Sequence, residues 1–325
     1  MSIRKKIKKR LLSTDAGMHL FYSVRRLREK NELARESDLE YIRNTYAKRF
    51  EQEINLTEPK TFQEKLQWLK LFYRDEDMPV CSDKYRIREF LEKKGYGWLA
   101  NEVIGVYTDA RDIPFEKLPK KFVAKATHGS GWNLICEDKD KLNWPAKVKI
   151  MNDWLKLNLS VFGREWNYKN IQPRIIVEKH LDHKPLNDYK YMCFNGEPVF
   201  IQLNNDFEGQ HYVDFFKIDT WEHFPCTYGP YVFSPTRIVE KPAQHDRMME
   251  IARDLSKQFP FVRVDFYNFD DKIVLGELTF FPGGGLWPFT PREVGKAYDL
   301  EVGSYLQLPE PNHNLELLAQ LKNQS

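Results

Sequence analysis

Cysteine is scarce in this chain, and its spacing excludes several kinds of chemistry. No Cys-x-x-Cys pair occurs, so neither a zinc ribbon nor a dithiol redox centre is expected. A His-Glu-x-x-His zinc motif and a Gly-x-Ser-x-Gly nucleophile elbow are also absent. The four cysteines lie far apart, at Cys81, Cys136, Cys193 and Cys226. We therefore expect reduced thiols and no acyl-enzyme chemistry.

Long apolar runs are missing as well. No run approaches the roughly 18 apolar residues that a membrane-spanning helix needs. Basic residues stand near the start of the chain, where a secretory signal would become apolar. The sequence therefore predicts a cytoplasmic protein. Apolar residues make up 42% of the 325 residues and aromatic residues 14%, which is enough for a folded core and favours two domains or one domain with an inserted lobe.

Charge is unevenly distributed along the chain. The formal net charge is +3, yet residues 1–30 hold ten lysines and arginines against two acids, a balance of +8 that leaves the remainder at −5. Ile3, Ile7 and Leu11 recur every four residues, as on one face of a helix. Such a basic arm can contact an anionic membrane surface or be a solvated terminus. Nucleic acid is not expected, because no nucleic-acid-binding motif is present.

Periodicity predicts helices first and strands later. Residues 15–74 are expected to be helical, with a capping box that starts at Thr61, and a second helix is expected from Ser82 to Gly95. A further helix is expected over 247–258. The expected strands are 122–126, 174–178, 189–194, 198–203, 261–268 and 272–280. The pattern predicts an α+β or mixed α/β fold.

The last two strands carry the strongest chemical pattern. If their hairpin is centred on Asp271, Asp265 lies opposite Glu277 and Arg263 lies opposite Thr279. Two adjacent carboxylates repel unless a cation or a proton lies between them. Oxygen ligands without cysteine or histidine suit Mg²⁺ or Mn²⁺. The alternative is a register shifted by one residue, with one carboxylate in solvent.

A glycine-rich loop follows the strand that carries Lys125. Gly129, Ser130 and Gly131 offer backbone N–H groups that could wrap phosphate oxygens, although no Walker A motif is present. An ordinary hairpin tip explains the same residues. His128 is a further candidate, as a general base or as a hydrogen-bonded structural residue.

Taken in order, these segments resemble the ATP-grasp superfamily, and in particular its teichuronopeptide-biosynthesis (TupA-like) branch, which is found among polysaccharide-synthesis proteins. The similarity covers roughly residues 60–310. It rests on residues 82–85, 125–133, 173–179, 186–190, 194–196, 261–265 and 276–280.

The resemblance implies a mixed α/β ATP-grasp fold in which the nucleotide is held between a small central lobe and a larger C-terminal lobe. It implies a central lobe over 116–182 and a C-terminal lobe over 183–325. These lobes follow the basic arm over 1–30, which lies outside the resemblance, and a helical N-terminal region over 31–115. ATP would be bound by Lys84, Lys125, Gly129, Ser130, Gly131, Glu178, Lys179, Leu181 and Asp188. Lys190 and Arg263 would face the transferred phosphoryl group and act in catalysis.

Asp265, Glu277 and Thr279 would bind Mg²⁺. Many superfamily members have asparagine where this chain has Thr279, and a hydroxyl is a weaker ligand, so the number of metal ions stays open.

The implied reaction is the ATP-dependent joining of a carboxylate to an amine through an acyl phosphate. The implied carboxylate belongs to a uronic acid of a capsular or other cell-surface polysaccharide or of its precursor. Segment 204–235 is expected to be loop-like and to help bind this acceptor through Asn204, His211 and Asp214, with His128 as a further contact. A sugar kinase and a non-catalytic nucleotide-binding or glycan-binding module are the alternatives.

Overall fold

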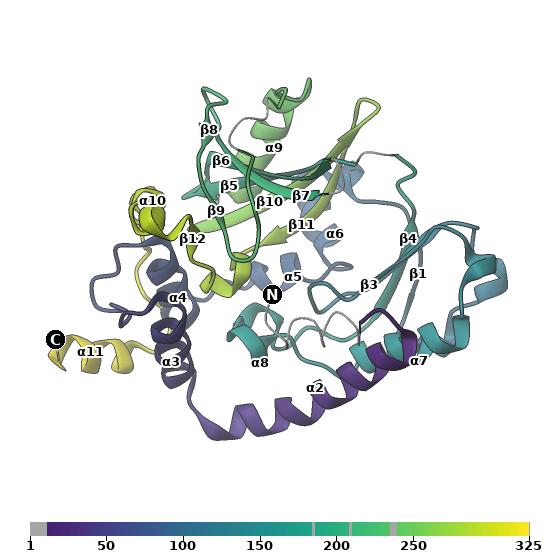
Figure 1. The fold of residues 1–325 in the computed structure, drawn as a ribbon, viewed down its shortest axis with the longest axis horizontal. Coiled ribbons are helices and arrows are strands. Elements are labelled where there is room, and N and C mark those ends of the chain that lie inside the picture. The colour runs from purple at the N-terminus through teal and green to yellow at the C-terminus, as the bar shows by residue number, and fades with distance from the viewer. Residues whose placement is uncertain (1–11, 184–185, 208–209, 235–238, 325) are drawn as a thin grey trace. The chain divides into compact units, whose positions relative to one another are not determined.

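A computed structural model describes residues 12–183, 186–207, 210–234 and 239–324 (Figure 1). The chain forms two compact units. Unit 1 comprises Met1–Ser37, Pro79–Phe90 and Asn101–Asp182, and unit 2 comprises Asp38–Met78, Leu91–Ala100 and His183–Ser325. The apolar positions Ile3, Ile7 and Leu11 lie outside the described residues.

Unit 1 is built on a four-stranded antiparallel sheet with the order β1-β4-β2-β3. Its strands are β1 (Val103–Tyr107), β2 (Phe122–Ala126), β3 (Asn133–Cys136) and β4 (Ile175–Lys179). The residues of β2 alternate between buried and half-buried positions, as the period of a strand requires. The strand expected at 122–126 is therefore confirmed, and the strand expected at 174–178 is present one residue later, as β4.

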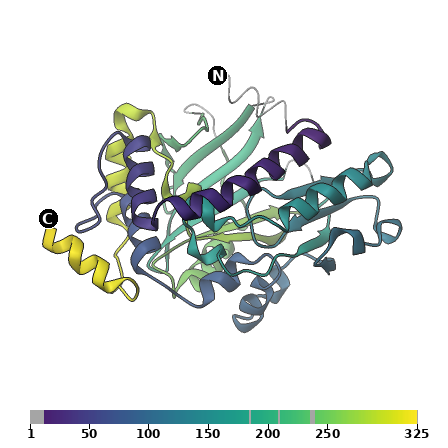
Figure 2. The ribbon, with the colours of Figure 1, turned by 90° about the horizontal axis from the view of Figure 1, so that it is seen from below.

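Helices complete unit 1. They are α2 (Asp15–Arg35), α7 (Trp144–Trp154) and α8 (Ser160–Gly163), with short 3₁₀ turns η2 (Ala110–Asp112), η3 (Phe115–Lys117), η4 (Lys139–Lys141) and η5 (Trp166–Tyr168). Figure 2 shows α2 running alongside α7, with which it is in contact. Tyr22 of α2 meets Trp154 of α7 edge to face, 6.2 Å between ring centroids, and both belong to a core that includes Phe122 and Ile175.

The helix expected from Ser82 to Gly95 is wrong in its first turn. Two short helices stand there instead, α5 (Asp77–Ser82) and α6 (Ile87–Lys93). Between them the Asp83 carboxylate accepts hydrogen bonds from the backbone N–H groups of Tyr85 (2.8 Å) and Arg86 (3.2 Å). Aspartate competes in this way with helical backbone bonding, so residues 83–86 form a turn.

Unit 2 is built on a six-stranded antiparallel sheet with the order β11-β10-β5-β6-β7-β8. Its strands are β5 (Asp188–Phe194), β6 (Glu197–Phe207), β7 (Gln210–Lys217), β8 (His223–Phe224), β10 (Phe261–Phe269) and β11 (Lys272–Thr279). A separate pair joins β9 (Thr227–Tyr228) to β12 (Phe289–Thr290). Asn195 and Gly196, with φ of 50° and 87°, make the expected tight turn between β5 and β6.

The expectation of a loop over 204–235 is wrong for its first part. β6 continues to Phe207 and pairs with β7 along eight residue positions. Polar and glycine residues are typical of loops, which is what the composition suggested. The backbone pairing and the burial of Val213, Phe215 and Phe216 make this segment a strand.

Helices also cover unit 2. They are α3 (Asp38–Phe50), α4 (Phe62–Phe72), α9 (His245–Ser256), α10 (Arg292–Ser304) and α11 (Leu315–Gln324), with 3₁₀ turns η1 (Gly97–Leu99) and η6 (Pro282–Gly285). The capping box is confirmed: Thr61 and Glu64 each accept a backbone hydrogen bond from the other residue. Figure 1 shows α9 beside the sheet, and it contacts β5, β6 and β10. Among the helices of the described ranges, none is both long enough and apolar enough to span a membrane.

Candidate functional site

The hairpin of β10 and β11 pairs the expected residues. Asp265 lies opposite Glu277, and Arg263 lies opposite Thr279. The turn is formed by Asp270 and Asp271, both with positive φ, so it is centred between these residues and not on Asp271. A bulge after Asp265 adds one residue to β11 and restores the expected pairing beyond it.

Lys190 of β5 extends this row across a third strand. It lies opposite Asp265 in the sheet, and its Nζ donates to Asp265 Oδ2 at 2.6 Å. The same Nζ lies 2.5 Å from Asp188 Oδ2. Lys190 is therefore buried between two carboxylates.

Arg263 occupies the space between the paired carboxylates. Its Nε and Nη2 donate to the two oxygens of Asp265, each at 2.7 Å. Nη2 also lies 3.4 Å from Glu277 Oε1 and 3.2 Å from Thr279 Oγ1. Arg263 Nη1 donates to the hydroxyl of Tyr228 at 3.3 Å. We call Asp188, Lys190, Arg263, Asp265, Glu277, Thr279 and Tyr228 the charged network.

The pKa values in this network follow from burial and from charge pairing. Burial alone would lower the pKa of Lys190, but Asp265 and Asp188 raise it above its ordinary value. Burial raises the pKa of Asp188, and the Lys190 ammonium only partly offsets this. The pKa of Arg263 is raised well above its ordinary value by Asp265 against the effect of burial. Both basic groups are therefore held in their charged forms.

The donor set of the network fits Mg²⁺. Mg²⁺ is usually held in proteins by one or two carboxylates together with substrate phosphates. Asp265 and Glu277 provide two carboxylates from opposed positions, and Thr279 Oγ1 donates to Glu277 Oε1 at 3.0 Å. Within the described ranges no cluster of three or more His, Cys, Asp or Glu residues could hold a metal by itself.

A second charged cluster lies in unit 1. Glu178 is buried on β4, where its two oxygens accept from Arg88 Nη2 at 2.9 Å and from Lys125 Nζ at 2.7 Å. Two of the residues expected to bind ATP, Glu178 and Lys125, are thus joined to each other. Arg88 is not among the expected residues, although it lies four residues after Lys84 and its Nη1 donates to the Lys84 carbonyl.

The glycine loop of unit 1 connects β2 and β3. Lys84 Nζ donates to the carbonyl of Gly129 at 2.6 Å, which brings the first expected nucleotide lysine to this loop. Gly131 has φ of 73°, a conformation that favours glycine. His128 is buried, its Nε2 lies 3.0 Å from the carbonyl oxygen of Trp154, and burial lowers its pKa to about 4. This imidazole is neutral at pH 7.

The other residues that were expected to bind ATP or the acceptor lie outside the two charged clusters. Lys179 is exposed and pairs with Glu102 at 3.1 Å, and Leu181 is half-buried just after β4. Asn204 accepts from Gln202 at 2.6 Å.

His211 and Asp214 lie on β7 in different surroundings. His211 is exposed and pairs with Asp206 at 2.7 Å. Asp214 is buried, accepts from the backbone N–H of Ser234 at 2.7 Å and lies 3.3 Å from His223 Nε2. An acceptor role for Asn204, His211, Asp214 and His128 stays a prediction.

Comparison with known proteins identifies the family to which this chain is similar. A family model described as TupA-like ATPgrasp matches residues 64–307. The fold is the mixed α/β ATP-grasp fold, preceded by N-terminal helices. Since the match covers most of the chain, the protein belongs to the TupA-like ATP-grasp family.

Several solved structures are similar at low sequence identity. D-alanine–D-alanine ligase from Bacillus anthracis complexed with ATP is 17% identical, with a TM-score of 0.36 over 62% of this chain and 55% of that chain. D-alanine–D-alanine ligase from Helicobacter pylori is 11% identical, with a TM-score of 0.37 over 75% and 69%. N5-carboxyaminoimidazole synthase from Aspergillus clavatus, in complex with ADP and 5-aminoimidazole ribonucleotide, is 14% identical, with a TM-score of 0.35 over 62% and 44%. The chain thus spans about half the length of the first and third of these proteins. No curated protein matches the sequence.

Proposed function

We propose that this protein is an ATP- and Mg²⁺-dependent carboxylate–amine ligase. In the proposed reaction a substrate carboxylate oxygen attacks the γ-phosphorus of ATP, which forms an acyl phosphate and releases ADP. An amine then attacks the acyl carbon, an amide forms, and inorganic phosphate and a proton are released. Membership of the TupA-like ATP-grasp family supports this chemistry, and the charged network is the observation that carries it.

The network supplies part of what phosphoryl transfer requires. This chemistry depends on positioning and on neutralising negative charge, and it needs no covalent nucleophile. Lys190 and Arg263 are fixed on neighbouring strands by Asp265, so their charges need little reorganisation. Mg²⁺, when bound by Asp265 and Glu277, would supply further positive charge at the phosphates.

Unit 1 would provide further nucleotide contacts. Lys125 and Glu178 are joined directly, and Lys84 contacts the glycine loop, so most of the expected ATP-binding groups of this unit lie in two small clusters. We propose that Lys84, Lys125 and the N–H groups of Gly129, Ser130 and Gly131 bind the phosphates. Glu178, Lys179 and Leu181 would bind the adenine, and Asp188 of unit 2 the ribose.

We propose a uronic acid carboxylate of a cell-surface polysaccharide or its precursor as the acceptor, with an amino acid or another amine as the second substrate. The resemblance described above supports this proposal, because the TupA-like branch is found among polysaccharide-synthesis proteins. The basic groups of the network are compatible with an anionic acceptor.

The test is phosphate release from ATP and Mg²⁺ in the presence of a panel of uronic acids and nucleotide-linked uronates, with and without mixed amino acids. Release should require both a carboxylate and an amine. The variants Asp265→Asn and Glu277→Gln should lose it, whereas Glu250→Gln, which changes an exposed glutamate on α9, should keep it.

Other outcomes would change the assignment. ADP formation with a sugar but without an amine would identify a sugar kinase. ATP binding without turnover on any pair, and without an acyl phosphate that hydroxylamine can trap, would identify a binding module.

We further propose that the N-terminal region contacts an anionic membrane surface from the cytoplasmic side. Leu20, Val24 and Leu27 of α2 are exposed by 55%, 40% and 64%, and they recur at helical spacing on one face of that helix. The charge of +8 over residues 1–30 suits acidic lipid headgroups, each nearby basic residue adding about 1 kcal/mol.

Co-sedimentation with phosphatidylglycerol vesicles tests this contact, with phosphatidylcholine vesicles as the control. We expect binding to the acidic vesicles alone, and weaker binding of a Leu20→Ser/Leu27→Ser variant. Equal binding to both kinds of vesicle, or none to either, would contradict the proposal.

A further inference from the structure

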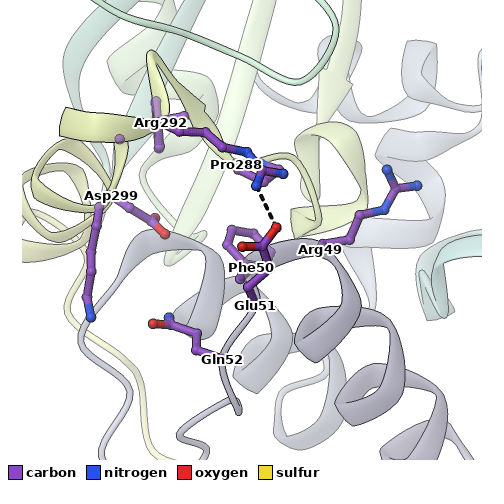
Figure 3. Close-up of a pocket in the computed structure, with 10 residues that line it drawn as sticks. Arg49, Phe50, Glu51, Gln52, Pro288, Arg292 and Asp299 are labelled. Atoms are coloured by element: carbon purple, nitrogen blue, oxygen red, sulfur yellow. Dashed lines mark hydrogen bonds and ion pairs between the residues drawn. The ribbon is translucent and has the colours of Figure 1, made fainter.

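A cavity of about 250 Å³ lies in unit 2, where the C-terminal end of α3 meets the N-terminal end of α10 (Figure 3). The cavity is slightly smaller than typical small-molecule sites, which span about 300–1,000 Å³. It therefore suits one small unit, such as a single sugar residue.

Three basic residues and two acids, Glu51 and Asp299, are among the residues that line this cavity. Arg49, Arg292 and Lys296 line it. Arg292 pairs with Glu51 at 2.7 Å, as the dashed line in Figure 3 shows. Arg49 and Lys296 have no ion-pair partner within the part of the chain that the structure describes. Arg49 and Lys296 are thus available for an anion, and Arg292, which donates to Glu51 through Nη1, keeps its other N–H groups for one.

Polar and apolar groups complete the wall. Figure 3 shows Asp299 and Gln52 on the side away from Arg49. Asp299 is buried, and one of its carboxyl oxygens accepts from a backbone N–H of α4 at 3.0 Å. Phe50 and Pro288 form an apolar surface, and stacking on Tyr46, with 4.2 Å between centroids, fixes the Phe50 ring.

These three kinds of group match the parts of an acidic sugar. Arginine and lysine bind carboxylate or phosphate oxygens through charge-assisted hydrogen bonds. A carboxyl group and an amide can hydrogen-bond hydroxyls, and an aromatic ring can contact the C–H face of a pyranose. We propose that this cavity binds one oxyanion-bearing sugar residue, with Arg49, Arg292 and Lys296 on its acidic group and with Asp299 and Gln52 on its hydroxyls.

The cavity is connected to the charged network through the fold. Phe289 in the cavity wall lies on β12, opposite Tyr228 of β9, whose hydroxyl accepts from Arg263. If the proposed acceptor is a glycan, the sugar bound in the cavity would be one of its acidic residues. That this sugar is part of the acceptor rests on the proposed ligase function. The binding of an acidic sugar in the cavity does not rest on it.

Calorimetry without ATP tests the binding directly. The probes are a glucuronic acid disaccharide, glucose 1-phosphate, the uncharged disaccharide cellobiose and inorganic phosphate. The first two probes should bind, and raising the salt concentration should weaken their binding. Arg49→Ala and Arg292→Ala should each weaken binding about tenfold, the loss of one charge-assisted hydrogen bond. The acidic probe that binds more tightly shows whether the site prefers a carboxylate or a phosphate.

A matched control removes Arg43, an exposed arginine of α3 that does not line the cavity. Arg43→Ala should bind like the wild type, and circular dichroism should show that all three variants are folded. Unchanged binding in the Arg49→Ala/Arg292→Ala double variant would overturn the proposal. Equal binding of cellobiose, or inorganic phosphate binding as tightly as glucose 1-phosphate, would also overturn it. Glu277→Gln should keep sugar binding while losing turnover, which separates this proposal from the ligase.

Discussion

Replacing Lys190 by methionine removes the ammonium that lies between the buried carboxylate of Asp265 and the half-buried carboxylate of Asp188, and it keeps most of the apolar stem. Its Nζ is 2.5 Å from Asp188 and 2.6 Å from Asp265. In this variant Asp265 keeps both of its hydrogen bonds from Arg263. Asp188 is therefore the carboxylate that is most affected, because it loses its ion pair with Lys190. Breaking one side of a buried ion pair costs about 3–5 kcal/mol, and we expect Lys190→Met to destabilise unit 2 by that amount at pH 7 and above.

The pH dependence follows from the direction of the Asp188 pKa. Burial raises this pKa above its ordinary value, so the folded state favours the protonated carboxyl. The destabilisation should therefore grow as the pH rises through the pKa of Asp188 in the folded variant, and it should nearly vanish in acid. Asp188→Asn combined with Lys190→Met should recover at least about 1 kcal/mol, because the orphaned charge is gone.

Hydrogen exchange of peptides from β5 and β10 reports this local stability without assuming that the two units unfold together. Lys272→Met, at an exposed position of β11, is the control and should leave exchange unchanged. A loss of less than about 1 kcal/mol in Lys190→Met, or no recovery in the double variant, would refute the reasoning.

Three further changes test other features of the fold. The pKa of Asp299 is raised by burial to about 7, so the wild type should lose up to about 4 kcal/mol of stability between pH 4 and 7. Asp299→Asn, which still accepts from the N–H of Gln63, should flatten that pH dependence in thermal melts. Gly196→Ala should cost about 1–2 kcal/mol in denaturant titration, because φ is 87° and a Cβ would lie 3.1 Å from the Cα of Lys257. Thr61→Ala should cost about 1 kcal/mol by losing the cap of α4, and a serine there should restore most of it.

Short motifs in the sequence predict the caps and turns that neighbouring residues alone determine. The capping box at Thr61 and the Asn195-Gly196 turn need only neighbouring residues, and both are confirmed. The pairing of Asp265 with Glu277 is also confirmed, although by two compensating features. The turn lies half a residue earlier than expected, and a bulge restores the pairing, which periodicity cannot reveal.

The contacts within the two charged clusters differ in how far the sequence could predict them. Arg263 and Asp265 are two residues apart on one strand, so they share a face and their contact could have been predicted. The meeting of Lys190 with Asp265 depends on β5 pairing with β10, strands separated by more than sixty residues along the chain. The pairing of Arg88 with Glu178 brings together residues that are 90 positions apart in the chain.

The charge balance of the network explains why a divalent cation belongs to the proposed chemistry. Three acids, Asp188, Asp265 and Glu277, are set against two bases, Lys190 and Arg263, which leaves a formal charge of −1 when all five are ionised. Both bases are already paired with Asp265, so their charge is partly neutralised before any phosphate approaches. A nucleotide triphosphate would add several negative charges to this surface. Positive charge from outside the network is then required, and the oxygen donors of Asp265 and Glu277 are of the type that Mg²⁺ prefers.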